Sequence, residues 1–502
     1  MRSIRGKAES IKRIGAAMAA LFMLLTFFPA EYEAVDPSLA YTYVYDAWKS
    51  AVDVPDPYSV RMQVDTNTLD IGALNAPSGM YAADGRLFIC DTGNDRIIEL
   101  RLGGSDYSLV RIIGGEGLSL KSPTDICTAD GLLIIADGGN NRVLILDEEL
   151  RTVREIYRPE SSTVDMTVPF VPRKLAVTAG HIFVQAKSVN RGLMEFDLEG
   201  EFLGYFGASP VKFDWQDYFW KLVATDEQRA SMISFVPTEY NNVSVDEEGF
   251  LMVSNSIFTA AELRSGAAEP VRRLNLKGTD ILIENGNHPV IGDITWDSAA
   301  GPSRIVDITS LPDNTYYAVD STRGRVFGYD EQGNMLYAFG GLGTKQGYFT
   351  SPAAIDHLGS DLLVLDSSSG LVTVFTLTEF GRLISDAIGS YSAGRYAESK
   401  ALWEEVQRYA GSYELAWDGI GKVLLREGDY RQALDYLQYA KDEYYYSKAW
   451  KLYRKQWIEE HIWIAVVLIG AALLAVFIKK ITKSVRDRID RYDARMETNN
   501  KL

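Results

Sequence analysis

The chain has 502 residues, of which 46% are hydrophobic and 24% are charged, a composition typical of folded globular domains. This length predicts two to four domains. The net charge of −17 argues against a nucleic-acid-binding surface, and two cysteines exclude a disulfide framework or a multi-cysteine metal site. The four histidines lie too far apart in sequence for a helical zinc-protease motif.

The chain begins with a basic stretch, which is followed by a short apolar run from Ile14 to Phe28. A basic head before a short apolar run is the layout of a secretory signal. We therefore predict that residues 1–40 are either a signal peptide, with Ser38-Leu39-Ala40 as the best cleavage site, or an uncleaved signal anchor that forms a second span.

A repeat of 46 residues dominates the next part of the chain. Residues 87–97 (LFICDTGNDRI) align with residues 133–143 (LIIADGGNNRV), and the same offset relates residues 317–320 to residues 363–366. Each unit contains three or four short apolar or alternating runs that Gly, Asp and Asn interrupt. A repeat of this size, with one small antiparallel sheet in each copy, predicts a β-propeller.

Two copies of the repeat carry the same turn sequence. It consists of an Asp that closes a strand, an Asn three residues later and an Arg five residues later: Asp91, Asn94 and Arg96 in one copy, Asp137, Asn140 and Arg142 in the next. The Asp can accept hydrogen bonds from loop amides, and the Arg can pair with acidic or carbonyl groups. This turn resembles the signature of NHL-repeat propellers, and its regular repetition indicates a structural role for these six residues.

The repeats predict a mainly β fold, a six-bladed NHL-like propeller over residues 58–380. The predicted blades lie near 74–113, 120–158, 172–207, 239–284, 304–340 and 352–376. Because the last unit is one strand short, we expect residues 58–64, which alternate like a strand, to complete it and close the ring. Seven blades are the alternative.

An insertion at residues 208–236 departs from the blade pattern and has helical spacing. Its aromatic residues Trp215, Tyr218 and Trp220 lie beside carboxylates, a combination that can stack on and bind sugars. With Tyr240 and Asn241, which begin the next blade, they form our candidate ligand site. The alternative is a helical plug with its aromatics buried.

After Phe380 the chain changes to helical spacing. Gly394 and Tyr396 recur 34 residues later as Gly428 and Tyr430. This spacing resembles the tetratricopeptide (TPR) repeat, and it predicts two TPR-like hairpins over residues 382–445. A connecting helix is expected over residues 446–461.

Residues 462–478 are 17 apolar or small residues without a charge, enough for a short transmembrane helix. Trp457 and Trp463 lie at one end, and the basic tail 479–502 follows at the other. By the positive-inside rule the tail is cytoplasmic and the rest of the protein is extracytoplasmic.

Some propellers that resemble this one are enzymes. The gluconolactonase-like group holds a divalent metal in the central channel with Glu, Asn and Asp, and this resemblance makes a metal-dependent hydrolase the runner-up. Under that alternative, calcium or another divalent metal would be held by Asp125, Asn241 and Asp307, with Asn242 as a further oxygen donor. Cys90 and Cys127 are expected to be buried thiols, or else one bridge between blades.

We expect binding rather than catalysis, with no cofactor. The sequence predicts a membrane-anchored extracytoplasmic scaffold of a bacterial cell envelope, accessory to a transporter or envelope complex. Its predicted partners are the membrane and a protein, with a glycan as the alternative ligand of the insertion.

Overall fold

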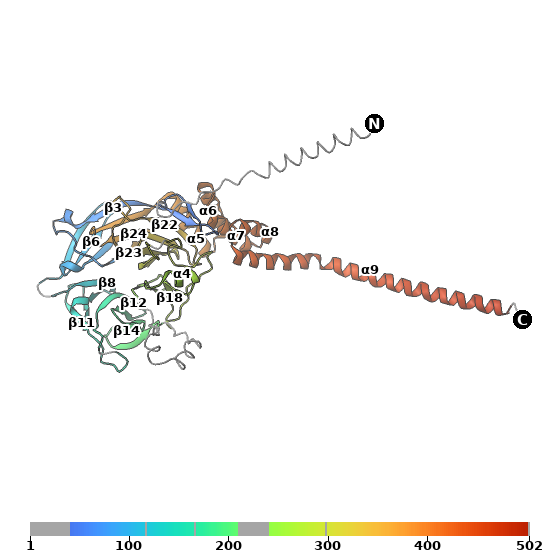
Figure 1. Cartoon of the computed structure of the whole chain (residues 1–502), viewed down its shortest axis with the longest axis horizontal. Coiled ribbons are helices and arrows are strands. Elements are labelled where there is room, and N and C mark those ends of the chain that lie inside the picture. Colours follow the sequence, from blue (N-terminus) through green and yellow to red (C-terminus); the bar gives the residue numbers. More distant parts are fainter. Residues whose placement is uncertain (1–40, 116–117, 165–166, 209–239, 297–298, 500–502) are drawn as a thin grey trace, which may run out of the picture. The chain divides into compact units, whose positions relative to one another are not determined.

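The computed structural model describes residues 41–115, 118–164, 167–208, 240–296 and 299–499. They form two compact units, one comprising Met1–Glu284 and His288–Gly381 and the other Asn285–Asn287 and Arg382–Leu502, over the described parts of those ranges. The first unit is a six-bladed β-propeller, as the repeats predicted. Figure 1 shows its sheets around a common centre, with the strands β8, β12 and β23 among the innermost.

Three blades are regular four-stranded antiparallel sheets built from consecutive strands. The first contains β4 (Gly79–Ala83), β5 (Arg86–Asp91), β6 (Arg96–Leu102) and β7 (Tyr107–Ile113). The second contains β8 (Pro123–Ala129), β9 (Leu132–Asp137), β10 (Arg142–Leu146) and β11 (Thr152–Ile156). The third contains β12 (Pro172–Thr178), β13 (His181–Ala186), β14 (Leu193–Asp197) and β15 (Phe202–Phe206).

The fourth and fifth blades differ from the first three in their number of strands. The fourth has three strands in the described residues, β16 (Asn242–Val245), β17 (Leu251–Ser254) and β18 (Val271–Leu274), and the short helix α4 (Ala260–Ser265) lies between the last two. The fifth contains β19 (Ile305–Ser310), β20 (Tyr316–Asp320), β21 (Arg325–Tyr329) and β22 (Met335–Gly340). A hairpin of β1 (Tyr43–Tyr45) and β2 (Ala51–Asp53) extends it to six strands. The sequence did not predict this hairpin, because three-residue strands carry too little periodicity.

The sixth blade closes the ring. Its strands β23 (Pro352–Leu358), β24 (Asp361–Asp366) and β25 (Leu371–Leu377) are completed by β3 (Tyr58–Asp65), which pairs antiparallel with β25. The predicted closure by residues 58–64 is therefore confirmed. Joining an early strand to the last blade leaves no open edge between the first and last repeats.

Tyr58 fixes this closure by packing between the fifth and sixth blades. Its ring stacks on Phe339 at 5.4 Å between centroids and meets Tyr317 edge-on at 5.8 Å. Its hydroxyl lies 3.3 Å from the hydroxyl of Tyr317. Other hydrophobic clusters likewise lie between neighbouring blades, so each blade is stabilised by the next.

The second unit is helical. It contains most of α5 (Glu379–Ser392), then α6 (Tyr396–Tyr409), α7 (Glu414–Glu427), α8 (Tyr430–Tyr439) and α9 (Glu443–Asn499). The turns after α5 and α7 lie at Gly394 and Gly428, both in the left-handed region. Two glycines of α7 allow close packing, because a Cβ at Gly419 would lie 2.4 Å from Nε1 of Trp403 and one at Gly421 2.7 Å from Cγ of Leu437.

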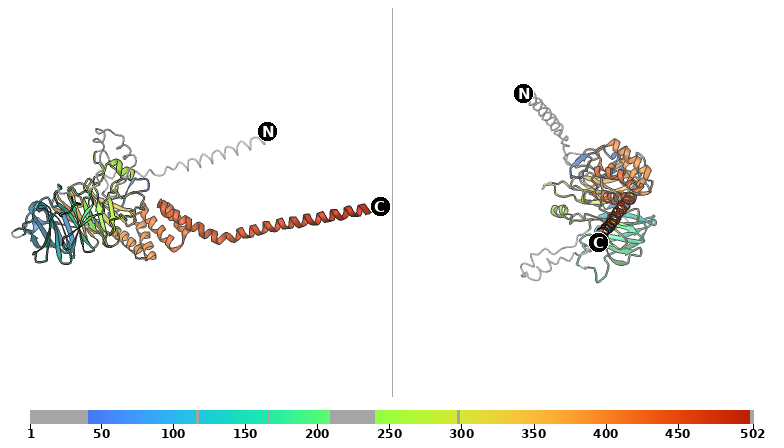
Figure 2. Two further views of the ribbon diagram at one scale, coloured as in Figure 1. Left: turned by 90° about the horizontal axis from the view of Figure 1, so that it is seen from below. Right: turned by 90° about the vertical axis from the view of Figure 1, so that its right-hand side faces the viewer.

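The helix α9 is unbroken over 57 residues (Figure 2). Its first turns pack in the helical unit, where Tyr445 and Ala449 are buried. Further along, it is long and apolar enough to cross a membrane, and its side chains there are exposed.

We predict that Tyr58→Ala lowers the free energy of propeller unfolding by about 3–5 kcal/mol, because it removes a fully buried aromatic side chain from the closing strand. The measurement is chemical unfolding of the detergent-purified chain, followed by tryptophan fluorescence. Ser59→Ala is the control, because Ser59 lies on the same strand and is exposed. Equal stability of the two variants would contradict the closing role of Tyr58.

Candidate functional site

The Asp residues that end the second strand of four blades bind the loop that leads into their own blade. Asp91 accepts a hydrogen bond from the backbone N of Asn75 at 2.7 Å, and Asp137 accepts one from that of Lys121 at 2.8 Å. Asp320 and Asp366 bind the amides of Arg304 and Thr350, again 16 residues earlier in the chain. All four carboxylates are buried, so each of these bonds satisfies a group that would be costly to leave unpaired.

The Asn and Arg of the repeat signature complete the same networks. Asn94 Nδ2 and Arg96 Nε donate to Asp91 Oδ2 at 2.8 and 2.7 Å, while Arg96 Nη1 donates to the carbonyl of Ile71 at 2.9 Å. In the next blade Asn140 and Arg142 repeat this arrangement around Asp137. Hydrogen bonds within their own blade and to the loop before it thus engage these six side chains.

The inner strands of all six blades surround a central cavity of about 220 Å³. Strand register places one residue of each inner strand at an equivalent position, which we call the ring position. Its six residues are Gly79, Asp125, Lys174, Asn242, Asp307 and Ala354. At Gly79 a side chain is excluded by close packing, because a Cβ there would lie 2.2 Å from the carbonyl oxygen of Thr124.

Three charged side chains of the ring position form a buried cluster. Lys174 Nζ lies 3.1 Å from Asp307 Oδ2 and 3.8 Å from Asp125 Oδ1. Each carboxylate also reaches the following blade: Asp125 accepts from the amide of Leu175 at 2.9 Å, and Asp307 from that of Ile355 at 3.2 Å. The cluster therefore ties inner strands together across blade boundaries.

Burial and ion pairing shift the pKa values of this cluster in opposite directions. Burial raises the pKa of Asp125 to about 7, against the lowering effect of Lys174, and it raises the pKa of Asp307 in the same way. Burial lowers the pKa of Lys174, but the two carboxylates outweigh it and the pKa lies above its ordinary value. The lysine is therefore a charged ammonium that lies between two carboxylates.

The predicted metal ligands do not come together as a cation site. Asp125 and Asp307 do meet in the channel, but the ammonium of Lys174 lies between them, where a metal would have to bind. Asn241 faces elsewhere, since its Nδ2 donates to the carbonyl of Ile305 at 2.8 Å and its Oδ1 accepts from Ser254. In the part of the chain that the structure describes, no group of three acidic, His or Cys side chains could hold a metal ion.

A second polar group in the channel was missed by the sequence analysis. Asp356 accepts from the amide of Ala82 at 2.7 Å, and Thr309 Oγ1 lies 2.8 Å from Nδ1 of His357. Burial lowers the pKa of His357, but Asp356 and Glu247 raise it above its ordinary value. Asp356 thus binds the sixth blade to the first, as Asp125 and Asp307 bind their neighbours. No sequence motif marks it, because Asp356 lies two residues beyond the ring position.

Some of the remaining predicted site residues lie within the described part of the chain and others lie outside it. Trp215, Tyr218 and Trp220 lie outside the described residues, so the predicted ligand site on the insertion stays a prediction. Tyr240 is buried and its hydroxyl bonds to the carbonyl of Gly207, a packing role. Cys90 and Cys127 are both buried free thiols, so they are not bridged in this structure. Burial raises the pKa of each thiol.

Comparisons with known proteins add little to this geometry. No protein-family model matches the chain, and no curated protein matches it. Among solved structures, virginiamycin B lyase from Staphylococcus aureus is 11% identical with a TM-score of 0.39, over 64% of this chain and 100% of that one. Hydrazine synthase from Kuenenia stuttgartiensis is 12% identical with a TM-score of 0.36, over 70% of this chain and 99% of that one. These likenesses are too distant to indicate a function.

We predict that the stability of the propeller falls between about pH 4 and pH 7 because of Asp125. Its pKa is raised in the folded state, so the folded protein binds more protons than the unfolded chain in that range. The stabilising contribution is complete below the ordinary pKa of an aspartate and is lost as the pH rises through about 7. Measuring unfolding against pH for wild type and Asp125→Asn tests this. A wild-type slope that the substitution leaves unchanged would refute it.

Lys174→Met should destabilise the propeller by about 3–5 kcal/mol, because it leaves two buried carboxylates without their cation. The triple variant Lys174→Met/Asp125→Asn/Asp307→Asn should recover much of this loss, since it removes the unpaired charges as well. Unfolding of both variants at pH 7 is the measurement. If the triple variant is no more stable than Lys174→Met, the cluster is not held by charge pairing.

Proposed function

We propose that the chain is a membrane-anchored, extracytoplasmic binding protein of a cell envelope, in which the propeller and helical unit act as a scaffold for a partner protein. The observation that carries this proposal is the helix α9. It begins with side chains buried in the helical unit and continues into an uncharged segment whose side chains are exposed. Exposed Leu468, Leu473 and Phe477 would be unfavourable in water and favourable in lipid.

The flanks of this segment support the proposed orientation. Trp457 and Trp463 lie at its N-terminal end, as interfacial aromatic residues do. Lysines and arginines follow from Lys479 onward, which favours a cytoplasmic tail. The propeller and the helical unit would then face the outside.

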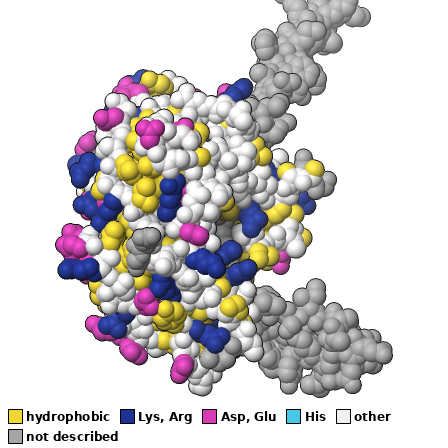
Figure 3. Space-filling model, turned by 90° about the vertical axis from the view of Figure 1, so that its left-hand side faces the viewer, with side chains coloured by type: hydrophobic (Ala, Val, Ile, Leu, Met, Phe, Trp, Pro, Cys, Tyr) yellow, Lys and Arg dark blue, Asp and Glu magenta, His cyan; other side chains and the backbone are white. Residues whose placement is uncertain are grey.

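Two observations support a binding role: the acids of the channel are already engaged, and the outer strands expose apolar side chains. The channel acids are engaged by backbone amides or by Lys174, which leaves no free carboxylate pair there among the described residues. Outer strands, by contrast, expose apolar side chains such as Leu109, Val110 and Val153. On the side of the propeller where β6 and β11 lie, hydrophobic side chains gather in patches between charged groups (Figure 3). Exposed apolar patches of this kind are typical of protein-binding surfaces.

The helical unit supports a partner site as well. Its two glycine turns recur at 34-residue spacing, and glycines allow α7 to pack closely on α6 and α8. We propose that residues 382–445 form TPR-like hairpins that receive a helix or tail of a protein in a transporter or envelope-assembly complex.

The membrane role is tested by alkaline carbonate extraction of membranes from cells that produce the chain. Wild type should stay in the membrane, while Leu468→Arg/Leu473→Arg should be extracted, because each arginine at the span centre costs about 2.5–3.5 kcal/mol. Leu468→Phe/Leu473→Phe is the matched control and should behave as wild type. Extraction of the wild-type chain would disprove the anchor.

A further inference from the structure

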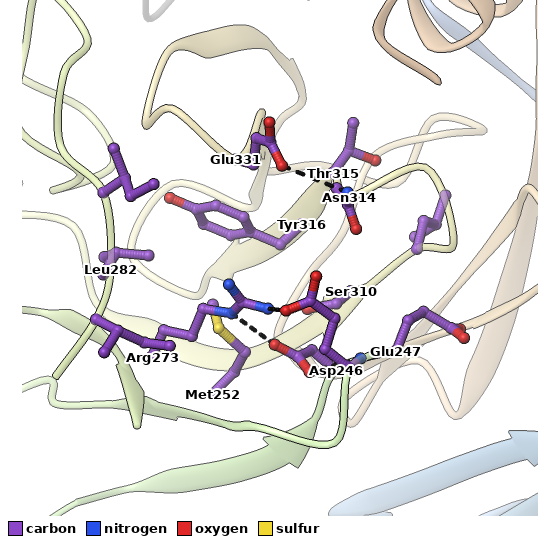
Figure 4. A pocket seen from close by; sticks show the side chains of 14 residues that line it. Asp246, Glu247, Met252, Arg273, Leu282, Ser310, Asn314, Thr315, Tyr316 and Glu331 are labelled. Atoms are coloured by element: carbon purple, nitrogen blue, oxygen red, sulfur yellow. Dashed lines mark hydrogen bonds and ion pairs between the residues drawn. The ribbon is translucent and has the colours of Figure 1, made fainter. Parts of the chain in front are cut away.

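A small pocket lies between the fourth and fifth blades, away from the ring position. It is formed by the turn after β16, the turn after β19 and the segment that follows β18 (Figure 4). We call it the turn pocket. Its volume of about 50 Å³ is room for three or four non-hydrogen atoms. A sugar ring is therefore too wide to enter it, whereas a longer linear ligand can enter with one end and leave the other end outside.

One hydroxyl in the turn pocket lacks a hydrogen-bond partner. Tyr316 is 5% exposed, and its hydroxyl oxygen has no partner among the described residues. Its ring is fixed by stacking on Tyr329 at 5.3 Å between centroids, and Figure 4 shows the side chain extending into the pocket. A buried hydroxyl without a partner is costly, and a bound polar group would remove that cost.

The charges around the pocket are mostly negative. Asp246, Glu247, Glu248 and Glu331 line it together with one cation, Arg273. Arg273 is already paired, since its Nε lies 2.6 Å from Asp246 Oδ2 and its Nη2 3.0 Å from Glu248 Oε2. Glu247 and Glu331 take no part in this pairing, so the charge at the pocket is net negative.

Neither of these two carboxylates has a strong partner. From the described residues, Glu331 accepts only a long hydrogen bond, 3.4 Å from Nδ2 of Asn314, and Glu247 lies 3.8 Å from His357 Nε2. Apolar side chains also line the pocket, among them Met252, Leu282 and Leu311. The pocket thus combines negative charge, one unpartnered hydroxyl and apolar side chains.

We propose that the turn pocket binds a primary ammonium group on a short aliphatic stem. The ammonium would donate hydrogen bonds to the Tyr316 hydroxyl oxygen and pair with Glu331, while the stem would lie against Leu282 and Met252. Two sources share this chemistry, the end of a lysine side chain of a partner and a free aliphatic amine. The inference needs neither the membrane span nor the helical unit, so a failure of the proposed anchored role would leave it standing.

The test is a calorimetric titration of the full-length chain in nonionic detergent with n-butylammonium, and with 1-butanol as the neutral isostere. We expect saturable binding of butylammonium that weakens at high salt, and no saturable binding of butanol. Tyr316→Phe should weaken butylammonium binding about tenfold, and so should Glu331→Gln, because each removes a charge-assisted contact. Glu199→Gln, which changes an exposed carboxylate of another blade, should leave the affinity unchanged.

Tyr316→Phe keeps the ring and removes an oxygen for which the described part of the chain offers no partner, so it should fold like wild type. It therefore tests the site even if Glu331→Gln does not fold. Equal binding of butanol, absence of saturable binding, or full affinity in Tyr316→Phe would overturn the proposal. So would tighter binding of a guanidinium compound than of butylammonium.

A second titration distinguishes the two sources. N-acetyl-lysine methylamide presents the same ammonium on a peptide unit. If it binds at least as tightly as butylammonium, the pocket is assigned to a lysine of a partner. If only butylammonium binds, the pocket is assigned to a free amine.

Discussion

The propeller depends on buried carboxylates that bind backbone amides. Four blades hold their entry loop through an Asp at the end of the second strand, and the inner strands are joined across blade boundaries by Asp125, Asp307 and Asp356. A buried carboxylate is stable only if its lone pairs are satisfied. Each of these bonds therefore fixes where one loop or one neighbouring strand must lie.

Lys174 balances this excess of buried acid. Without it the ring position would hold two buried carboxylates near each other with no cation. With it, the cluster is held together, but the oxygens that a metal would need are already engaged. The same interaction that stabilises the channel thus occupies the position between Asp125 and Asp307.

Much of the propeller could be predicted from its sequence, because the same physical requirement recurs in four of the six blades. The position four residues after the Asp must be left-handed: Asp95 and Asn141 meet this in the first two copies, and Gly324 and Gly370 in the later ones. The copy at Asp320 lost the Asn and the copy at Asp366 lost both the Asn and the Arg, but both kept the Asp and a residue that tolerates positive φ. For this reason the predicted blades and the closing strand could be identified even where the signature had diverged.

The site could not be predicted in the same way. Whether Asp125 contacts a metal or a lysine depends on Lys174, which is 49 residues away and carries no motif. Asn241 and Asn242 are adjacent, and only strand register shows that the second of them occupies the ring position. The turn pocket likewise could not be predicted from the sequence, because its lining residues come from separate turns and loops of two blades.

We propose that this protein works by holding a partner at a membrane. The most direct measurement is affinity capture of the full-length chain from gently solubilised membranes, with quantitative mass spectrometry of what is retained. The account predicts a membrane-associated protein in near-stoichiometric amount, which is lost when capture is repeated with the soluble Leu468→Arg/Leu473→Arg chain. A chain that is recovered alone from intact membranes would contradict it.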